Sequence, residues 1–314
     1  MPYGLAGLAL AWQRAEPLMG EMATGLALVL GAAAALVFAA LLLATLLRAQ
    51  RHPEAWAEDR RHPVRHTFIA ALPIAALLLA TVAVTLLGPS AWAGALWWLG
   101  ALGLLGVTVW TLGRWWRPKA LGGLQWASIT PVLFIPIVGN VLVPLAGVPL
   151  GHAEWSLAQF GIGLMFWPVV LVLLLARILV QGPWPERLLP SGFILLAPPA
   201  VVGLSGLQLG MPVALGWLCW GMAVFCFLWA GSLAGRIRTL PFSLAHWALS
   251  FPLAALAALT LRLATPGSPM AALGPVLLAL ASIVVFTLVM GTVRGLRDGT
   301  LLAPEAVAPI VMAE

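Results

Sequence analysis

Long apolar runs alternate with short polar connectors along the whole chain. A run of about 20 apolar residues is long enough to cross the hydrocarbon core of a bilayer as an α-helix. We therefore predict an all-α integral membrane protein with ten transmembrane helices. The predicted helices cover residues 1–12, 24–47, 67–87, 92–112, 126–147, 155–179, 192–209, 213–233, 242–261 and 273–292.

The first run is the shortest of the ten. Its 12 residues would extend about 18 Å as a helix, against a hydrocarbon core of about 30 Å. We therefore expect part of this helix to lie upstream of the printed start. No secretory-type cleavage pattern precedes the first run, so every apolar segment is expected in the mature chain.

The composition supports a membrane protein, and it indicates that the basic residues orient the chain in a bilayer rather than bind nucleic acid. The chain is 62% hydrophobic and only 8% charged, and a soluble domain cannot cover so much apolar surface with so few charges. Its 16 Lys and Arg residues lie in connectors, where they orient a chain in a bilayer, so we exclude nucleic acid as a partner. Cys219 and Cys226 share one run and are predicted to be packing residues.

The basic residues are distributed very unevenly between the two sets of connectors. Fourteen of the 16 lie near the ends of the even-numbered runs or in the segments that follow them, and only Arg14 and Arg262 lie in the other set. Basic connectors stay in the cytoplasm. We therefore expect both termini to be cytoplasmic.

Interior prolines follow the parity of the runs. Odd-numbered runs carry Pro73, Pro136, Pro198 and Pro252, Pro2 fits if the first helix begins upstream, and Pro168 in the sixth run is the exception. A proline removes one N–H and frees a carbonyl, and such backbone is tolerated at membrane depth only when it is buried in protein or faces water. Each proline alone is explained equally well by a packing kink. The alternation favours five helical hairpins, with the odd-numbered helices around a central pore.

Candidate chemistry is sparse. We find no catalytic or metal-binding motif, and therefore predict no enzyme activity, no metal and no cofactor. His52, His62 and His66 lie in the most basic connector, where cation binding is opposed. No run contains an acidic residue, whereas coupled transporters commonly use intramembrane carboxylates. This absence favours a passive conduit, and the basic connectors favour anions.

Polar residues inside runs leave two alternatives open. His246 is the one ionisable residue clearly within a run, which makes it a candidate pH sensor, although its position near a run start lets the ring reach water or headgroups. Asn140 and Gln159 fit interhelical hydrogen bonds as well as they fit a pore.

Five segments carry a resemblance to a known family, and two of them make it specific. The segments "ERLLPSGFILLAPPAVVG" and "FSLAHWALSFPLAAL", together with "MPYGLAGLALAW", "HPVRHTF" and "ITPVLFIPIVGN", resemble helices of the bacterial tellurite-resistance protein TehA and the plant slow-type anion channels. That group also includes fungal malate and sulfite permeases. The resemblance implies five hairpins, a pore formed by the odd-numbered helices, and a homotrimer.

The resemblance also implies site residues. The family's gating phenylalanine matches Phe251, which Pro252 would project into the pore as a plug. Pro73, Pro136, Pro198, Pro252 and Gly4 are placed along the pore. His246 stands where the family more often has tryptophan, so gating here could respond to pH.

The resulting hypothesis is a multi-pass passive anion channel or permease of the bacterial inner membrane. Residues 1–293 would form the transmembrane channel domain and residues 294–314 a short cytoplasmic tail. Its partners would be small inorganic or organic anions and the lipid bilayer. The alternative is a proton-coupled exporter of dicarboxylate, sulfite or tellurite.

Overall fold

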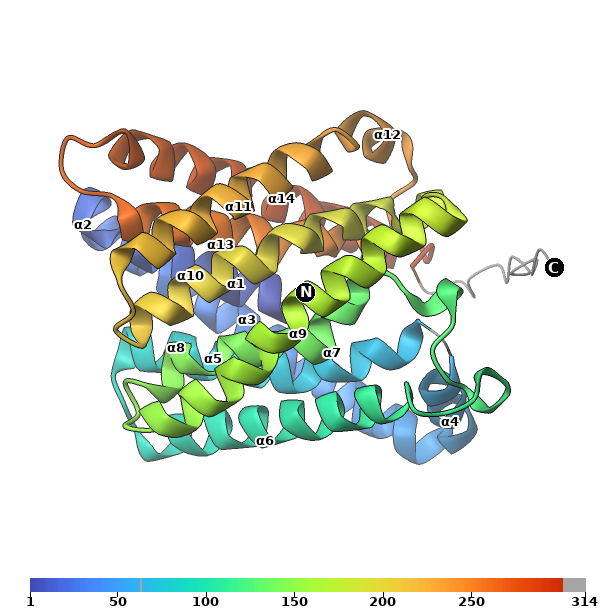
Figure 1. Cartoon of the computed structure of the whole chain (residues 1–314). Coiled ribbons are helices and arrows are strands. Elements are labelled where there is room, and N and C mark those ends of the chain that lie inside the picture. Colours follow the sequence, from blue (N-terminus) through green and yellow to red (C-terminus); the bar gives the residue numbers. More distant parts are fainter. Residues whose placement is uncertain (63, 302–314) are drawn as a thin grey trace.

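The computed structural model describes residues 1–62 and 64–301, and these are helical with connecting turns. Eight helical stretches in this part of the chain are long and apolar enough to cross a membrane. They correspond to eight of the ten predicted runs (Figure 1). The stretches are Glu21–Arg51, Arg65–Leu87, Ala91–Gly113, Ala153–Gln181, Glu186–Gln208, Val213–Gly231, Leu244–Leu263 and Pro269–Arg297.

The first and fifth predicted crossings differ from the other eight. Helix α1 (Pro2–Arg14) has 13 residues. The fifth run is broken into short pieces, because Pro131, Pro136 and Pro144 interrupt the regular i to i−4 hydrogen bonds of an α-helix. Its pieces are η3 (Trp126–Ser128), η4 (Pro131–Leu133), α7 (Phe134–Val138), η5 (Gly139–Leu142) and α8 (Pro144–Gly147). The described residues therefore contain eight full-length candidates and two shorter segments rather than ten equivalent helices.

Four odd-numbered runs change from a 3₁₀-helix to an α-helix part-way along. The pairs are η1 (Arg65–Ala70) with α5 (Ala71–Leu87), η4 with α7, η6 (Glu186–Leu196) with α10 (Ala197–Gln208), and η7 (Leu244–Leu249) with α13 (Ser250–Leu263). In each pair a predicted proline lies in the first turn of the α-helix, as Pro73 and Pro252 do at the third position. Proline is tolerated there because the first N–H groups of an α-helix have no intrahelical partner. These prolines therefore mark junctions between helix types, not kinks within one continuous α-helix.

Burial separates the helices into two classes. In α3 (Glu21–Arg51), α6 (Ala91–Gly113), α9 (Ala153–Gln181), α11 (Val213–Gly231) and α14 (Pro269–Arg297), between 17% and 33% of the most apolar stretch is buried. In the stretches that join η1 to α5, η6 to α10 and η7 to α13, the buried share is 67% to 78%. The first class is called the outer helices below.

The second class, together with α1 and the broken fifth run, surrounds the centre of the molecule. We call these five the inner elements: α1, η1 with α5, the pieces from η4 to α8, η6 with α10, and η7 with α13. Their contacts form a closed ring, in which α1 touches α5, α5 touches α8, α8 touches α10, α10 touches α13, and α13 returns to α1. Each inner element also packs extensively against the outer helix that follows it in the chain, as α13 does against α14 (Figure 1).

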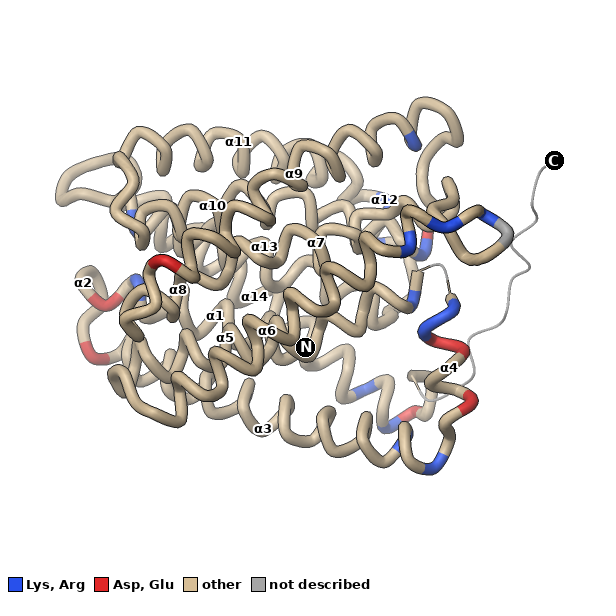
Figure 2. The backbone as a smooth tube through the Cα atoms, turned by 60° about the horizontal axis from the view of Figure 1, so that its bottom comes forward, with Lys and Arg blue, Asp and Glu red and all other residues tan. Residues whose placement is uncertain are grey.

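Charge is concentrated at one end of the bundle (Figure 2). This arginine-rich end is where the inner elements begin. The helix ends and connectors that meet at this end contain Arg48, Arg51, Arg60, Arg61, Arg65, Arg114, Arg117, Lys119, Arg177, Arg187, Arg236, Arg238, Arg294 and Arg297. Helix α14 continues to Arg297, so the boundary predicted at residue 293 falls inside its last turn, and residues 302–314 of the predicted tail lie outside the described residues.

Candidate gate and its surroundings

Phe251 lies where α13 meets α1, two of the inner elements. It is the second residue of α13, directly after the junction with η7, and it is half-buried. Its ring rests on Gly7 of α1, because a Cβ atom added at Gly7 would lie only 2.8 Å from Cδ2 of Phe251. The missing side chain at Gly7 therefore makes room for the Phe251 ring.

Gly4 brings α1 even closer to α13. A Cβ atom at Gly4 would lie 2.2 Å from Oγ of Ser250, which is closer than real side-chain contacts allow. Ser250 is buried and donates a hydrogen bond of 2.6 Å to the carbonyl oxygen of Trp247. Gly4 thus packs against the side chains of Ser250 and Trp247, just before Phe251, and its predicted place along a pore stays a prediction.

Gly7 and Ser250 are the residues of this contact that sequence reasoning missed. The signal for Gly7 was available, because positions three apart lie on the same face of a helix, and Gly4 and Gly7 have that spacing. Ser250 had no comparable signal, since its role depends on a partner almost the whole chain away.

The predicted proline positions are all on inner elements, but two of them contact an outer helix. Pro73 is half-buried beside Gly103 of α6, where an added Cβ would lie 3.3 Å from Cβ of Pro73. The carbonyl oxygen of Pro136 accepts a hydrogen bond of 2.7 Å from Oγ1 of Thr108, also in α6. These contacts place Pro73 and Pro136 where they shape the wall of the ring. Pro198 and Pro252 are buried, and a lining role for all four stays a prediction.

A buried polar network joins the broken fifth run to α6 and α9. Asn140 is fully buried and donates to Oγ1 of Thr108 at 2.8 Å. Its Oδ1 accepts from Nε2 of Gln159 at 2.8 Å, and Oε1 of Gln159 accepts from Trp155 at 2.9 Å. Asn140 and Gln159 therefore form interhelical hydrogen bonds, which is one of the two alternatives that the sequence left open.

Further side chains bind carbonyl groups that the interrupted backbone of this run leaves free. Trp97 of α6 donates to the carbonyl oxygen of Val143 at 3.0 Å, and Ser205 of α10 donates to that of Val141 at 2.6 Å. A free backbone carbonyl inside a membrane protein needs such a partner. The wall formed by residues 131–147 is thus held in place by its neighbours on several sides.

His246 has a local structural role at the start of η7. Its Nδ1 accepts a hydrogen bond of 3.2 Å from the backbone N–H of Ser243, as part of a capping box. The imidazole also stacks on Phe242, with ring centroids 5.6 Å apart. A role in pH sensing stays a prediction.

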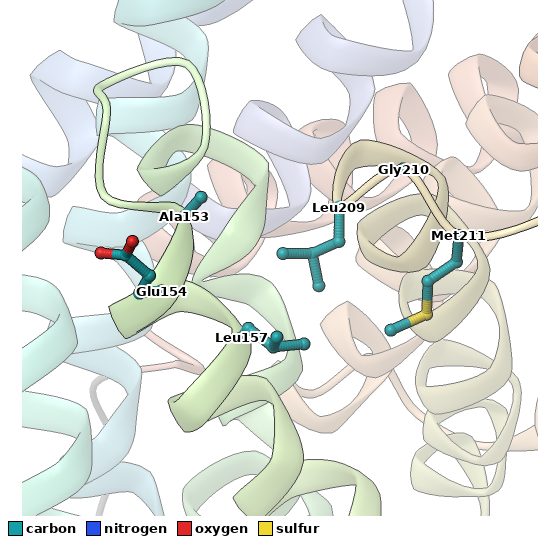
Figure 3. A pocket seen from close by; sticks show the side chains of 6 residues that line it. All are labelled: Ala153, Glu154, Leu157, Leu209, Gly210 and Met211. Atoms are coloured by element: carbon teal, nitrogen blue, oxygen red, sulfur yellow. The ribbon is translucent and has the colours of Figure 1, made fainter.

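Two cavities lie away from Phe251. The larger, of about 340 Å³, is lined by Ala153, Glu154, Leu157, Leu209, Gly210 and Met211 at the end opposite the arginine-rich one (Figure 3). The smaller, of about 160 Å³, lies among α9, η6 and α11. Both adjoin outer helices, so the candidate gate does not depend on them.

The comparison with known protein families decides the class of this molecule. Residues 1–293 match the voltage-dependent anion channel family. The chain belongs to this family. Its members are channels rather than enzymes, which agrees with the multi-pass helical structure described above.

Parts of the chain are also similar to two individual S-type anion channels of a plant. The chain is 30% identical to the S-type anion channel SLAH3 of Arabidopsis thaliana over 169 residues, which is 52% of this chain and 26% of that protein. It is 33% identical to SLAH2 of the same plant over 136 residues, or 42% of this chain and 26% of the relative. The match thus spans about a quarter of the length of these relatives. The predicted resemblance to slow-type anion channels is confirmed, and the closer one to TehA stays a prediction.

Proposed function

We propose that this chain is a passive anion channel in which ions cross through the ring of inner elements and Phe251 closes the path. The observation that carries this proposal is the contact of the Phe251 ring with Gly7, between two of the inner elements that form the closed ring. Membership of an anion channel family supports the choice of anions as the permeating species.

The inner elements are suited to form a path because the outer helices separate them from lipid. Irregular backbone at membrane depth needs to be buried in protein or to face water. The four junctions between 3₁₀- and α-helix all lie on inner elements, and none of the five outer helices has one among the described residues. The irregular backbone is therefore concentrated where a water-accessible path would lie.

Phe251 suits a gate that works without charge. A bulky aromatic ring in a narrow apolar neck blocks ions by size and by excluding water. On the side of α1, Gly7 presents no side chain to the phenylalanine ring. Glu186, at the arginine-rich start of η6, is the only acid among the described residues of the inner elements, and this charge pattern favours anions over cations.

Finer features belong to the same proposal. We place the chain in a bacterial inner membrane as five hairpins, with the arginine-rich end and both termini in the cytoplasm, and we propose a homotrimer. Fourteen basic residues at one end against two at the other support this orientation. The contacts of each inner element with the next outer helix support the hairpins.

Current through planar bilayers tests the gate. Phe251→Ala should raise the anion current by about tenfold or more, since removing a barrier of only about 1.4 kcal/mol has that effect. Phe286→Ala is the matched control, because Phe286 is 66% exposed on outer helix α14. A reversal potential that follows the anion gradient is expected in both. An unchanged closed channel in Phe251→Ala would overturn the plug.

The position of the titratable His246 side chain, a little over one turn before Phe251, is the observation that favours the proton-coupled alternative. In that case anion export from vesicles would respond to a pH gradient and fall in His246→Gln. Transport that follows only the anion gradient in both proteins would exclude it.

A further inference from the structure

At the end opposite the arginine-rich one, the few basic and acidic residues lie on different helices. Its two basic residues, Arg14 and Arg262, lie on the inner elements α1 and α13. Its acidic residues lie elsewhere: Glu16 on α2 (Glu16–Met19), Glu21 at the start of α3, and Glu154 at the start of α9. Positive charge is therefore next to the central ring, and negative charge is outside it.

The register of α1 against α13 brings the two arginines to the same level. The two helices run in the same direction, because Gly4 faces Ser250 and Gly7 faces Phe251 and Ala254. Arg14 follows Gly7 by seven residues, and Arg262 follows Ala254 by eight. Both intervals are about two turns of helix. The two positive charges are accordingly close enough to repel each other.

Neither arginine has an acidic partner within residues 1–62 and 64–301. Ion pairs in that part of the chain join Arg48, Arg65 and Arg236 to carboxylates, all at the arginine-rich end. A single arginine in the last turn of a helix is favoured by the helix dipole. Two such arginines side by side repel each other, and an anion between them would offset that repulsion.

We propose that Arg14 and Arg262 form a recruitment site for small anions at this end of the channel. The inference rests on the proposed function, since it places the site on the path that Phe251 closes. Arg262 lies 11 residues beyond Phe251 in the sequence, or about 16 Å along a helix axis. A guanidinium group donates paired N–H bonds to the oxygens of a planar oxyanion, so the site should prefer nitrate to chloride.

Conductance in the open Phe251→Ala background tests the site. We expect Arg14→Gln and Arg262→Gln each to raise the nitrate concentration for half-maximal current by about three- to tenfold when nitrate enters from the face where these two arginines lie. When nitrate enters from the arginine-rich face, that concentration should not change. The difference should shrink near 1 M salt, where the screening length is only about 3 Å. Arg297→Gln, at the end of outer helix α14, is the matched control.

Lysine variants separate charge from geometry. Arg14→Lys and Arg262→Lys should keep the one-sided recruitment but lose the preference of nitrate over chloride. Since Arg262 is exposed, its variants are expected to fold even if those of the half-buried Arg14 do not. Unchanged half-saturation from both faces in Arg262→Gln would overturn the site while leaving the channel intact.

A binding measurement keeps this inference distinct from the proposed function. Nitrate should raise the melting temperature of the detergent-solubilised protein at low salt, and Arg262→Gln should reduce that shift. If Phe251→Ala carries no anion current, the channel proposal fails, and a nitrate shift that depends on Arg262 would still support the anion site. Equal shifts in the wild type and Arg262→Gln would refute the site.

Discussion

The fifth and ninth runs of the chain both contain interior prolines, but the backbone around these prolines is held in different ways. In residues 131–147, side chains from α6 and α10 bind the interrupted backbone, Gln159 of α9 binds the side chain of Asn140, and most residues are buried. In η7 and α13, the junction leads directly to Phe251, whose half-buried ring rests on a glycine without a polar partner. The fifth-run backbone is held by hydrogen bonds from neighbouring helices, whereas the Phe251 ring itself is held only by packing.

This difference separates a wall from a part that can move. Moving residues 131–147 would break several buried hydrogen bonds at once, each of which is costly to leave unmade. Turning the Phe251 ring away from Gly7 would break none. We therefore expect substitutions in the fifth run to change stability, and substitutions at the contact of α1 with α13 to change the current.

The largest stability effect should come from the buried network. Asn140→Ala removes the partner that Gln159 and Thr108 share and leaves a small cavity. We expect a loss of about 2–3 kcal/mol in unfolding free energy, measured by thermal or denaturant unfolding in detergent. Thr45→Ala is the control, because Thr45 only bonds the carbonyl of its own helix at Leu41. A stable Asn140→Ala with a raised resting current would reverse the roles of the two regions.

Gly7→Ala tests the contact of α1 with α13, where we expect the current to change. The new methyl group would lie 2.8 Å from the Phe251 ring, and such overpacking typically costs about 1–3 kcal/mol. The ring must move, so the resting current should change. Adding Phe251→Ala should remove most of the stability cost, with a coupling energy of about 1 kcal/mol in a double-mutant cycle.

Gly25→Ala on outer helix α3 is the control for this pair. No atom lies within 4 Å of the added Cβ at Gly25, so this change should leave the current as it was. Additive effects of Gly7→Ala and Phe251→Ala would mean that the two residues do not touch in the closed channel.

The smallest effect is expected at the start of η7. His246→Ala removes the acceptor for the Ser243 N–H, and loss of a cap costs about 1 kcal/mol. His52→Ala, at an exposed connector histidine, should change stability by less. A current that becomes independent of pH only in His246→Ala would give this residue a role in gating beyond its cap.

Much of the fold could be predicted from the sequence, because burial in lipid demands long apolar segments wherever they cross. Eight of the predicted runs match helices long enough to span. The fifth run was predicted as one crossing, although Pro131, Pro136 and Pro144 already indicated its breaks. Its apolar composition is the same whether the backbone is one helix or several pieces, so hydrophobicity alone could not distinguish the two.

The amino-acid sequence by itself determined which segments are apolar, where the prolines interrupt them and at which ends the arginines gather. These are local properties of composition and spacing. Only the tertiary structure decided that Phe251 rests on Gly7 and that Arg14 reaches the level of Arg262. Those partners are more than 200 positions apart in the chain, and their contact depends on how closely two glycines let α1 approach α13.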